Sequence, residues 1–588
     1  MKPTGYEAQK LAKIFFEMGY ILDMQGVAFK PRAYEMASEV LIALGDEVKE
    51  TWKQGGKKAL DELPGIGASM AEKIDEFYRT GRVKEYEKMK KTFPVDIWSL
   101  ASIEGVGPKT IKDFYKNLKV KSIKDLEAAI KKHKIQKLKG YGKQSEENIA
   151  RGITMKKQAS GRRLLGDVLP IAEGMVEKLK RVKGVKHCAY AGSLRRRKTT
   201  IGDIDIVATA DTPKRIVDAF CSLPEVQSVH EKGKNRASVR LAIGMDADIL
   251  VVPDKVYGAA LQHFTGDKRH NVLLRQYALG KGYTLSEYGI FKRGKGKHKG
   301  SKLIPCKTED VIYNKLGLDT PPPEIRIGEN EIEAAEAHSL PKLIPYGSVK
   351  GDLQVQTNWT DGRASIADMA TAAKKTGLSY MAVTDHTKAL AFIHGLDDAG
   401  VEKQIREIKK LNASLKGFRI FTGTECDIAK DGSLDLENRT LAKLEWVGVS
   451  VHSAFRLPAK EQTKRIVRAI SNPNVDCYFH PFARIIGERE PIEFDFAEVL
   501  AAAKQHEVAL EIDCYPDRSD LDAQFVREAV KAGVKLVINT DAHAPEHFDF
   551  LPLGEALARR GWAKKSDILN TKNAKELEAY LRKKRKRG

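Results

Sequence analysis

The sequence predicts a multidomain protein with all-α helical domains at the N-terminus, an α/β domain in the middle and an α/β barrel at the C-terminus. Glycine-containing turns between helical segments recur between residues 60 and 145. A strand that carries two aspartates follows near residue 203, and beyond residue 350 apolar strands alternate with helices. With 588 residues, the chain is long enough to form several hydrophobic cores.

The net charge is distributed unevenly along the chain. Residues 1–320 carry the whole net charge of +22, and residues 321–588 sum to zero. A basic half of this kind favours nucleic-acid binding, with solvated helix lysines as the alternative interpretation.

The cysteines and the apolar segments bear on the location of the protein. The 6 cysteines are scattered and form no C-x-x-C pair, which argues against a disulfide framework or a zinc ribbon. No apolar stretch is long enough to cross a bilayer, and the N-terminus has no evident signal peptide. We therefore expect a cytoplasmic protein that has no membrane partner.

The N-terminal segments EAQKLAKIFFEMGYIL and YEMASEVLIAL have apolar residues at helical spacing. LPGIG follows at residues 63–67, and its pattern recurs as IEGVG at 103–107 and LKGYG at 138–142. Such helix-hairpin-helix turns let backbone N–H groups approach a DNA phosphate, although a single one can be purely structural. The predicted DNA contacts are Gly65, Gly67, Gly105, Gly107, Gly140 and Gly142.

The stretch Gly192–Val207 reads GSLRRRKTTIGDIDIV. Asp203 and Asp205 stand two residues apart in an apolar run, so a strand would place both carboxylates on one face. Like charges at that distance repel unless a cation lies between them, and Mg²⁺, or Mn²⁺, is the natural candidate. Asp248 in GMDADILVV precedes another buried-strand pattern and is the expected third carboxylate.

The same stretch offers groups that bind a triphosphate. Gly192 lets the backbone approach a ligand, Ser193 adds a hydroxyl, and the basic residues 195–198 neutralise negative charge. The alternative for a bare Asp-x-Asp, a solvated strand end, does not account for all of these features.

On these motifs, residues 1–320 resemble a family X DNA polymerase of the polymerase-beta type, in the nucleotidyltransferase superfamily. The segment VYGAALQHFTGDKRHNVLLRQYALGKGYTLSEYGIF resembles the family's nucleotide-selecting segment over its whole length. The resemblance implies Asp203, Asp205 and Asp248 as catalytic metal ligands, and dNTPs with gapped or primer-template DNA as substrates of a monomer. It also implies a nucleotide-binding set of Gly192, Ser193, Arg196, Gly202, His263, Phe264, Gly266, Asn271 and Arg275.

The resemblance also places the Schiff-base lysine of a deoxyribose-phosphate lyase at Lys73. Lys30 and Tyr34 match supporting residues of the family, but Ser69 and Glu85 stand where the beta-type enzyme has lysines. Lyase activity at Lys73 is therefore a hypothesis, with a solvated helix lysine as the alternative.

Six regions follow from these assignments. They are an N-terminal helix-hairpin-helix domain like the 8-kDa domain of polymerase beta (1–85), a helix-hairpin-helix DNA-binding subdomain (86–155), a nucleotidyltransferase palm (156–255), a nucleotide-contacting subdomain (256–320), a proline-marked linker (321–347) and a C-terminal domain (348–588).

In the C-terminal domain, acidic or histidine residues follow most of the apolar strand segments, as in YMAVTDHTK and KLVINTDAHA. That pattern describes an α/β barrel whose active site lies at the C-terminal rim. It resembles the PHP (polymerase and histidinol phosphatase) domain, a distorted (β/α)7 barrel that gathers up to three ions such as Zn²⁺ or Mn²⁺. The resemblance implies the ligand set Asp361, His386, Glu425, His452, His480, Asp541 and His543.

One departure from the PHP pattern is important. The family opens with D-L-H-x-H, whereas this chain reads D-L-Q-V-Q, with Gln354 and Gln356 in place of the histidines. Neutral amides are poor ligands for such ions, so we expect one of three sites to be empty or weak. The other ligands would hold two ions, one among Glu425, His452 and His480, and another among Asp361, His386 and His543.

The two resemblances together imply a bacterial- or archaeal-type DNA polymerase X that fills short gaps during base-excision repair, with a PHP 3′–5′ exonuclease that the loss of two histidines predicts to be weakened or lost. One alternative is a template-independent nucleotidyltransferase. Another is a non-catalytic scaffold that binds DNA ends or abasic sites. A third keeps the barrel as an abasic-site nuclease or phosphoesterase that works with fewer metal ions.

Overall fold

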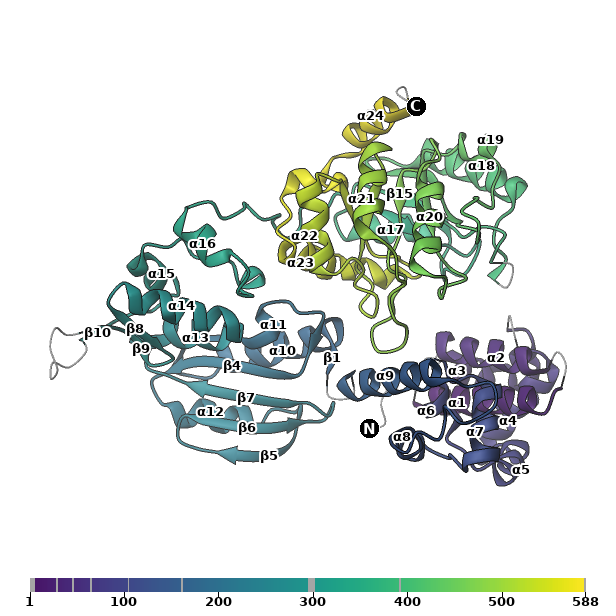
Figure 1. The fold of residues 1–588 in the computed structure, drawn as a ribbon, viewed down its shortest axis with the longest axis horizontal. Coiled ribbons are helices and arrows are strands. Elements are labelled where there is room, and N and C mark those ends of the chain that lie inside the picture. The colour runs from purple at the N-terminus through teal and green to yellow at the C-terminus, as the bar shows by residue number, and fades with distance from the viewer. Residues whose placement is uncertain are drawn as a thin grey trace. The chain divides into compact units, whose positions relative to one another are not determined.

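The structure, a computed structural model, describes residues 6–27, 30–44, 47–63, 66–103, 105–159, 162–293, 302–390 and 393–585. The chain forms two compact units, one made by Met1–Ser160 with Gly487–Arg489 and the other by Gly161–Ile486 and Glu490–Gly588 (Figure 1). No helix among the described residues combines the length and the apolar character that a membrane span requires.

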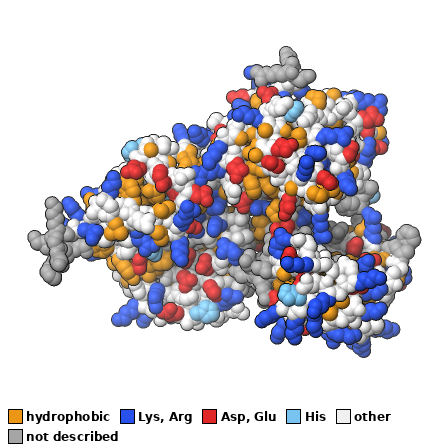
Figure 2. All heavy atoms as spheres, viewed as in Figure 1, with side chains coloured by type: hydrophobic (Ala, Val, Ile, Leu, Met, Phe, Trp, Pro, Cys, Tyr) orange, Lys and Arg blue, Asp and Glu red, His pale blue; other side chains and the backbone are white. Residues whose placement is uncertain are grey.

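The first unit is all-α, as predicted, and is built around two hydrophobic cores that share helix α1. Leu11 and Phe15 of α1 lie in one core, and Ile21 and Met24 lie in the other. Lys and Arg side chains are abundant on the face of this unit that Figure 2 shows. Its helices are α1 (Tyr6–Met24), α2 (Lys30–Leu44), α3 (Glu47–Asp61), α4 (Ala68–Thr80), α5 (Lys84–Thr92), α6 (Ile97–Ala101), α7 (Pro108–Leu118), α8 (Ile123–Lys131) and α9 (Lys143–Ala159).

The second unit begins with an α/β palm. Its sheet has the strand order β2-β4-β7-β6-β5, and β4 and β7 are parallel neighbours. Ile204 and Ile206 of β4 point into the core, so Asp203 and Asp205 alternate to the opposite face. The elements are β1 (Arg163–Leu164), α10 (Leu165–Lys180), β2 (Val185–Tyr190), α11 (Gly192–Arg195), β3 (Thr200–Ile201), β4 (Asp203–Ala210), α12 (Pro213–Cys221), β5 (Val226–Lys232), β6 (Arg236–Leu241) and β7 (Asp246–Val251).

A small helical and antiparallel region follows the palm. Its elements are η1 (Asp254–Val256), α13 (Tyr257–Thr265), α14 (Lys268–Gly280), β8 (Tyr283–Ser286), β9 (Gly289–Lys292), β10 (Lys302–Ile304) and α15 (Asp310–Leu316). The predicted linker contains two short helices, η2 (Pro323–Ile325) and α16 (Glu331–Glu336). Its Arg326 is buried and pairs with Glu309, so this segment is packed against the domain that precedes it.

The C-terminal domain is the predicted barrel of seven parallel strands. Strands β11 to β17 are neighbours in chain order, and Gln356 beside β11 donates its N–H to Ala542 beyond β17 at 2.8 Å, which brings the first and last strands together. The strands are β11 (Gly351–Val355), β12 (Tyr380–Val383), β13 (Arg419–Asp427), β14 (Trp446–Ser450), β15 (Cys477–Tyr478), β16 (Ala509–Asp513) and β17 (Leu536–Asn539).

Alternate strand residues of the barrel face two separate apolar layers. Met381 and Val383 pack in the cluster that also contains helix residues, whereas Tyr380 and Ala382 pack in an inner cluster, which Leu577 of α24 joins. Because apolar side chains fill both layers along the strands, the side chains that could bind a metal ion lie at the strand ends. The helices are α17 (Ile366–Lys375), α18 (Asp398–Ser414), α19 (Asn438–Leu441), α20 (Ala459–Ile470), α21 (Phe496–Gln505), α22 (Ala523–Ala532), α23 (Leu551–Arg560) and α24 (Ala574–Arg585).

Candidate functional site

The register of the two central palm strands brings the aspartates together. In the parallel pair β4 and β7, Asp205 lies opposite Asp248, and Asp203 lies opposite Asp246. Burial, together with the charges of Asp203 and Asp248, raises the pKa of Asp205 to about 7. Burial also raises the pKa of Asp248. Carboxylates held together in this way fit divalent cations, which would relieve their repulsion.

A fourth acidic residue on the same face, Asp246, is neutralised by the chain itself. Its carboxylate lies 2.9 Å from Arg240 and 3.5 Å from His230. The hydrogen bond from Arg240 lowers the pKa of Asp246 below its ordinary value. Asp246 therefore differs from the three residues predicted to hold metal ions, although it stands in the same strand as Asp248.

Gly192 provides the close backbone approach that the sequence suggested. The N–H of Ala191 donates to the carbonyl oxygen of Asp205 at 2.8 Å, and Gly192 has a φ of +60°. A Cβ placed on Gly192 would lie 2.2 Å from Oδ2 of Asp205. Only glycine leaves room for this carboxylate and adopts the left-handed backbone without strain.

Gly192→Ala is therefore expected to lower nucleotide incorporation by about 10- to 100-fold, because the added methyl group pushes the Asp205 carboxylate out of the position in which it would bind a metal ion. The measurement is single-nucleotide insertion into gapped DNA. Gly174→Ala is the matched control, since a Cβ on that α10 residue would meet no atom within 4 Å. Equal rates for the two variants would contradict the assigned role of Gly192.

The basic residues after Gly192 connect the palm to the next subdomain. Arg196 is 8% exposed, donates to the carbonyl oxygen of Thr265, and lies 3.6 Å from Asp267. Arg195 pairs with Glu309 at 2.6 Å. Glu309 also pairs with Arg326, so one carboxylate faces two guanidinium groups and positive charge is left for an anion near Asp205.

Part of the predicted nucleotide-contacting set holds the turn between α13 and α14. The Asn271 amide donates to the carbonyl oxygen of His263 at 2.7 Å and accepts from Gln262 at 2.8 Å. A Cβ on Gly266 would lie 2.4 Å from Nδ2 of Asn271, and Gly266 has a φ of +28°. Arg275 donates to the carbonyl oxygen of Asn271 at 3.1 Å. The Asn271 side chain therefore maintains this turn, and its contact with nucleotide remains a prediction.

The other residues of that set lie on α13, on α11 and beside β4. The ring of His263 lies 5.3 Å from that of Phe264, and burial lowers the pKa of His263, so its neutral form is favoured. Gly202 directly precedes β4, and a Cβ there would lie 3.1 Å from the guanidinium of Arg162. Ser193 lies within the single turn of α11.

The three hairpins of the first unit have the same turn geometry. In each, an N–H bonds back to the carbonyl three residues earlier at 3.0 Å: Ile66 to Leu63, Val106 to Ile103 and Tyr141 to Leu138. A helix then begins directly after Gly67, Gly107 and Gly142. A Cβ at any of these three glycines would meet no described atom within 4 Å, so each helix start is open to a phosphate.

Two further hairpin glycines have the left-handed backbone that these turns require. Gly105 has a φ of +85° and Gly140 a φ of +91°. Gly65 lies outside the described residues.

Lys73 is held by acidic and polar neighbours. Its Nζ lies 3.0 Å from Glu85, donates to Ser69 Oγ at 3.1 Å, and stands 5.7 Å from the ring centre of Tyr34. Burial acts to lower the pKa of Lys73, but Glu85 and Tyr34 outweigh it and raise that pKa above the ordinary value. Since an amine nucleophile needs a lowered pKa, this environment disfavours the lyase hypothesis, which remains untested.

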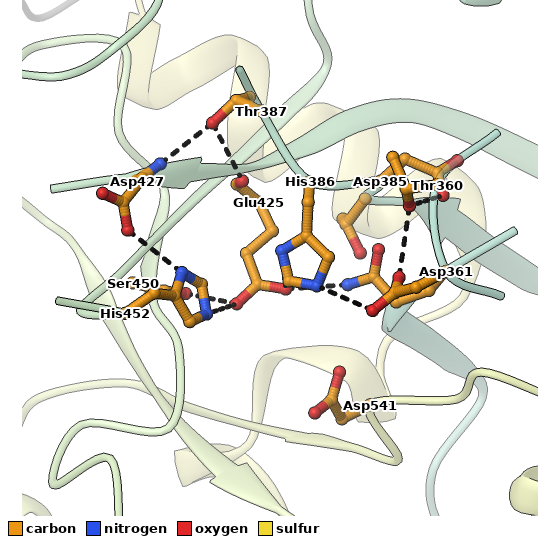
Figure 3. A network of polar contacts seen from close by, with 12 residues as sticks. Thr360, Asp361, Asp385, His386, Thr387, Glu425, Asp427, Ser450, His452 and Asp541 are labelled. Carbon is orange, nitrogen blue, oxygen red and sulfur yellow. Dashed lines mark hydrogen bonds and ion pairs between the residues drawn. The ribbon is translucent and has the colours of Figure 1, made fainter. Parts of the chain in front are cut away.

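The C-terminal rim of the barrel gathers the predicted metal ligands around Glu425 (Figure 3). Two groups of ligand atoms lie close enough to share an ion: Asp361 with His386 and His543, and His386 with Glu425 and His452. Nε2 of His386 lies 3.6 Å from Asp361, and its Nδ1 lies 3.5 Å from Glu425. Imidazole and carboxylate suit Zn²⁺ or Mn²⁺, so both groups fit a metal ion.

The first of these groups is the expected one, and the second contains His386 where the sequence suggested His480. Nε2 of His480 lies 2.8 Å from Oε1 of Glu425, the same oxygen that lies 3.2 Å from Nε2 of His452. Sequence reasoning also missed Asp427, which lies 3.1 Å from Nδ1 of His452 and orients that imidazole. Its position two residues after Glu425 on β13 was the available signal, because both side chains then share one face.

The third group of the PHP pattern does not fit a metal ion. Gln356 donates its amide to Glu425 at 2.7 Å, and neither amide atom of Gln354 has a hydrogen-bond partner among the described residues. The guanidinium of Arg518 lies 3.6 Å from both Asp513 and Asp541. Amides thus replace the two imidazoles, and a cation of the chain stands beside the carboxylates. We expect Asp541 to pair with Arg518 when no metal ion is bound there.

Family models and relatives agree with this arrangement. The chain matches models of a helix-hairpin-helix domain (residues 7–83), a SAM-like helix-hairpin-helix tandem (99–153), the DNA polymerase beta thumb (260–327) and the PHP domain (352–515).

Similar proteins cover both halves of the chain. A "DNA polymerase/3'-5' exonuclease PolX" from Bacillus subtilis (strain 168) is 36% identical over 522 residues, which cover 88% of this chain and 90% of that protein. A probable phosphatase from Thermoanaerobacter sp. (strain X514) is 31% identical over 38% of this chain and 91% of its own length. DNA polymerase lambda from Rattus norvegicus is 25% identical over 44% of this chain and 46% of its own length.

Proposed function

This chain belongs to the bacterial PolX family of family X DNA polymerases, and from that premise we propose that it fills short gaps in DNA during base-excision repair. It is a nucleotidyltransferase with helix-hairpin-helix regions and a PHP domain, and DNA and dNTPs are its substrates. Three similar hairpin turns, each with an open helix start, support binding to the backbone of a DNA duplex.

The single observation that carries the catalytic assignment is the register of β4 and β7, which sets Asp205 against Asp248 beside Asp203. These carboxylates would hold two Mg²⁺ or Mn²⁺ ions, which when bound activate the primer 3′-OH and stabilise negative charge on the phosphates. Arg196 and the Gly192 backbone would orient the triphosphate, and the His263–Phe264 pair would face the sugar.

The polymerase proposal is tested with gapped DNA labelled at the primer, in the presence of Mg²⁺ and single dNTPs. Incorporation of the nucleotide complementary to the template, and no extension of a single strand, is the expected result. Equal extension with and without a template would instead favour a template-independent nucleotidyltransferase. Binding with no extension at all would favour a DNA-end scaffold.

We also propose that the 3′–5′ exonuclease named in the Bacillus subtilis relative is weakened in this chain, because the PHP rim offers imidazole ligands for two ions rather than three. Gln354 and Gln356 contribute amides where the third site needs stronger donors. Arg518 supplies a fixed positive charge beside Asp513 and Asp541, which weakens the attraction for another cation.

Restoring the two histidines is expected to restore the third site. The double variant Gln354→His/Gln356→His should bind one further Mn²⁺ ion and trim a labelled 3′ end about tenfold faster or more, because a water-activating metal is regained. The measurements are metal content by elemental analysis and trimming in the absence of dNTPs. Both are made with Asp205→Asn present, so that the palm contributes neither ions nor synthesis.

Gln354→Leu/Gln356→Leu is the matched control, since it removes the same amides without adding a ligand. Fast, metal-dependent trimming by the unmodified chain that is lost with His452→Ala but kept with Asp205→Ala would contradict the proposed weakening.

A further inference from the structure

A side chain of the PHP domain reaches the nucleotide-binding turn of the palm. Arg560, the last residue of α23, donates from Nη1 to the carbonyl oxygen of Arg196 at 2.9 Å. Arg196 follows α11 directly, in the turn that begins at Gly192. The contact therefore joins the C-terminal barrel to the segment that we assign to the triphosphate.

Helix α23 is fixed at both of its ends. Near its start, Leu553 belongs to the hydrophobic core of the palm, and a Cβ on Gly166 of α10 would lie only 3.3 Å from it. Near its end, Arg559 pairs with Glu324 at 2.8 Å and donates to the carbonyl oxygen of Ile344 at 2.8 Å. Arg560 thus projects from a backbone that is already held in place, so only the rotamer freedom of its side chain is lost when it holds its partner.

The turn that receives this hydrogen bond needs support. Arg197, directly after the accepting carbonyl, has a φ of +54°, which is unusual for a residue other than glycine. The N–H of Lys198 then closes the turn on the carbonyl oxygen of Ser193 at 3.1 Å. Such a conformation persists only where the surroundings hold it, and Arg560 bonds to the peptide group that leads into it.

Positive charge is concentrated at this point. Burial lowers the pKa of Arg196, Lys198 and Arg560, and the charge of Arg560 lowers the pKa of the other two further. Asp267 is a carboxylate that opposes the effect at all three, and at Arg560 the carboxylates of Asp522 and Glu324 oppose it more strongly. Among the described residues, Nε of Arg196 and Nε of Arg560 are buried without a hydrogen-bond partner. Buried guanidinium groups that keep unused donors are suited to an anion.

We propose that Arg560 is a positioning residue for DNA synthesis: the PHP domain uses it to hold the Gly192–Lys198 turn and to add positive charge beside the triphosphate of the incoming nucleotide. Through this contact the barrel contributes to nucleotide binding independently of its own metal chemistry. The inference rests on the proposed nucleotide-binding role of that turn.

The test compares Arg560→Gln and Arg560→Lys in the full chain, with Lys565→Gln as a control that removes one exposed positive charge from the same domain. Single-nucleotide gap filling gives kcat and the KM for dNTP, fluorescence anisotropy gives DNA affinity, and thermal melting reports folding. Arg560→Gln is expected to raise the KM for dNTP about tenfold while kcat and DNA affinity change by less than about twofold. Arg560→Lys should recover part of this loss, because it keeps the charge without the planar fork.

Two results would overturn the inference. One is a KM for dNTP in Arg560→Gln equal to that of the Lys565→Gln control. The other is an equal fall in kcat, DNA affinity and melting temperature in both Arg560 variants, which would show a purely structural role. Arg196→Gln tests the nucleotide-binding role of the turn separately from the positioning role of Arg560. If Arg196→Gln raises the KM for dNTP and Arg560→Gln does not, only Arg560 is wrongly assigned. If neither variant raises the KM, the nucleotide-binding role of the turn fails as well.

Discussion

Asp205→Asn is expected to lower nucleotide incorporation by about 10³- to 10⁵-fold, because several kcal/mol of charge stabilisation by bound cations is lost. Asparagine keeps the shape of the side chain and removes its charge. Among the palm carboxylates, Asp205 has the pKa that is raised most: burial and two neighbouring aspartates raise it to about 7. Single-turnover insertion into gapped DNA with saturating Mg²⁺ measures the loss.

DNA binding by the Asp205→Asn variant should stay unchanged, because the hairpin glycines lie in the other compact unit of the chain. Asp246→Asn is the matched control: it removes the same charge from the same face of the sheet, but from a carboxylate already paired with Arg240. We expect this control to alter incorporation by no more than about threefold, as for other exposed ion pairs. Similar losses in both variants, or primer extension by Asp205→Asn at the unmodified rate, would refute the assignment of the catalytic carboxylates.

His386→Ala is expected to remove both metal ions from the PHP domain, since this imidazole belongs to both ligand groups. A metal ion that keeps only two of three ligands should bind about 10²-fold more weakly or worse. Elemental analysis after dialysis against Mn²⁺ or Zn²⁺ measures the change, again with Asp205→Asn present to keep the palm free of ions.

His338→Ala provides the comparison, because His338 is an exposed imidazole that pairs with Asp319 outside the barrel. That variant should retain the full metal content. In a chain with an intact palm, His386→Ala should also leave Mg²⁺-dependent synthesis within about twofold, because the two sites use different ligands. Retention of both ions by His386→Ala would show that the metal ligands are assigned incorrectly.

The sequence predicted those parts of the fold that depend on local periodicity. Period two within a single apolar run was enough to place Asp203 and Asp205 on one face of a strand. Repetition of the glycine-containing turns predicted the helical hairpins, and the turns at Ile103–Val106 and Leu138–Tyr141 have the same hydrogen bond. Polar residues at successive strand ends predicted an α/β barrel, and the resemblance to the PHP domain implied its seven strands, which the structure has.

Details of the sites that depend on pairing between distant segments could not be predicted from the sequence. Asp246 and Asp248 are equivalent in a strand pattern, and only the approach of Arg240 from β6 neutralises one of them. The parallel pairing that continues from β12 and β13 brought His386 next to Glu425 and made it common to both metal groups, where the resemblance had suggested His480. The Asn271 amide, assigned to nucleotide by resemblance, is engaged by Gln262 and His263.

The sequence by itself therefore determined which side chains this protein has for joining nucleotides and for binding metal ions, because strand and hairpin patterns are local. Only the tertiary structure decided which of them act together. Arg560 and Arg196 are 364 positions apart, and no periodicity relates them. Their contact exists because the apolar side chain of Leu553 is buried in the core of the palm and carries the end of its helix to the nucleotide-binding turn.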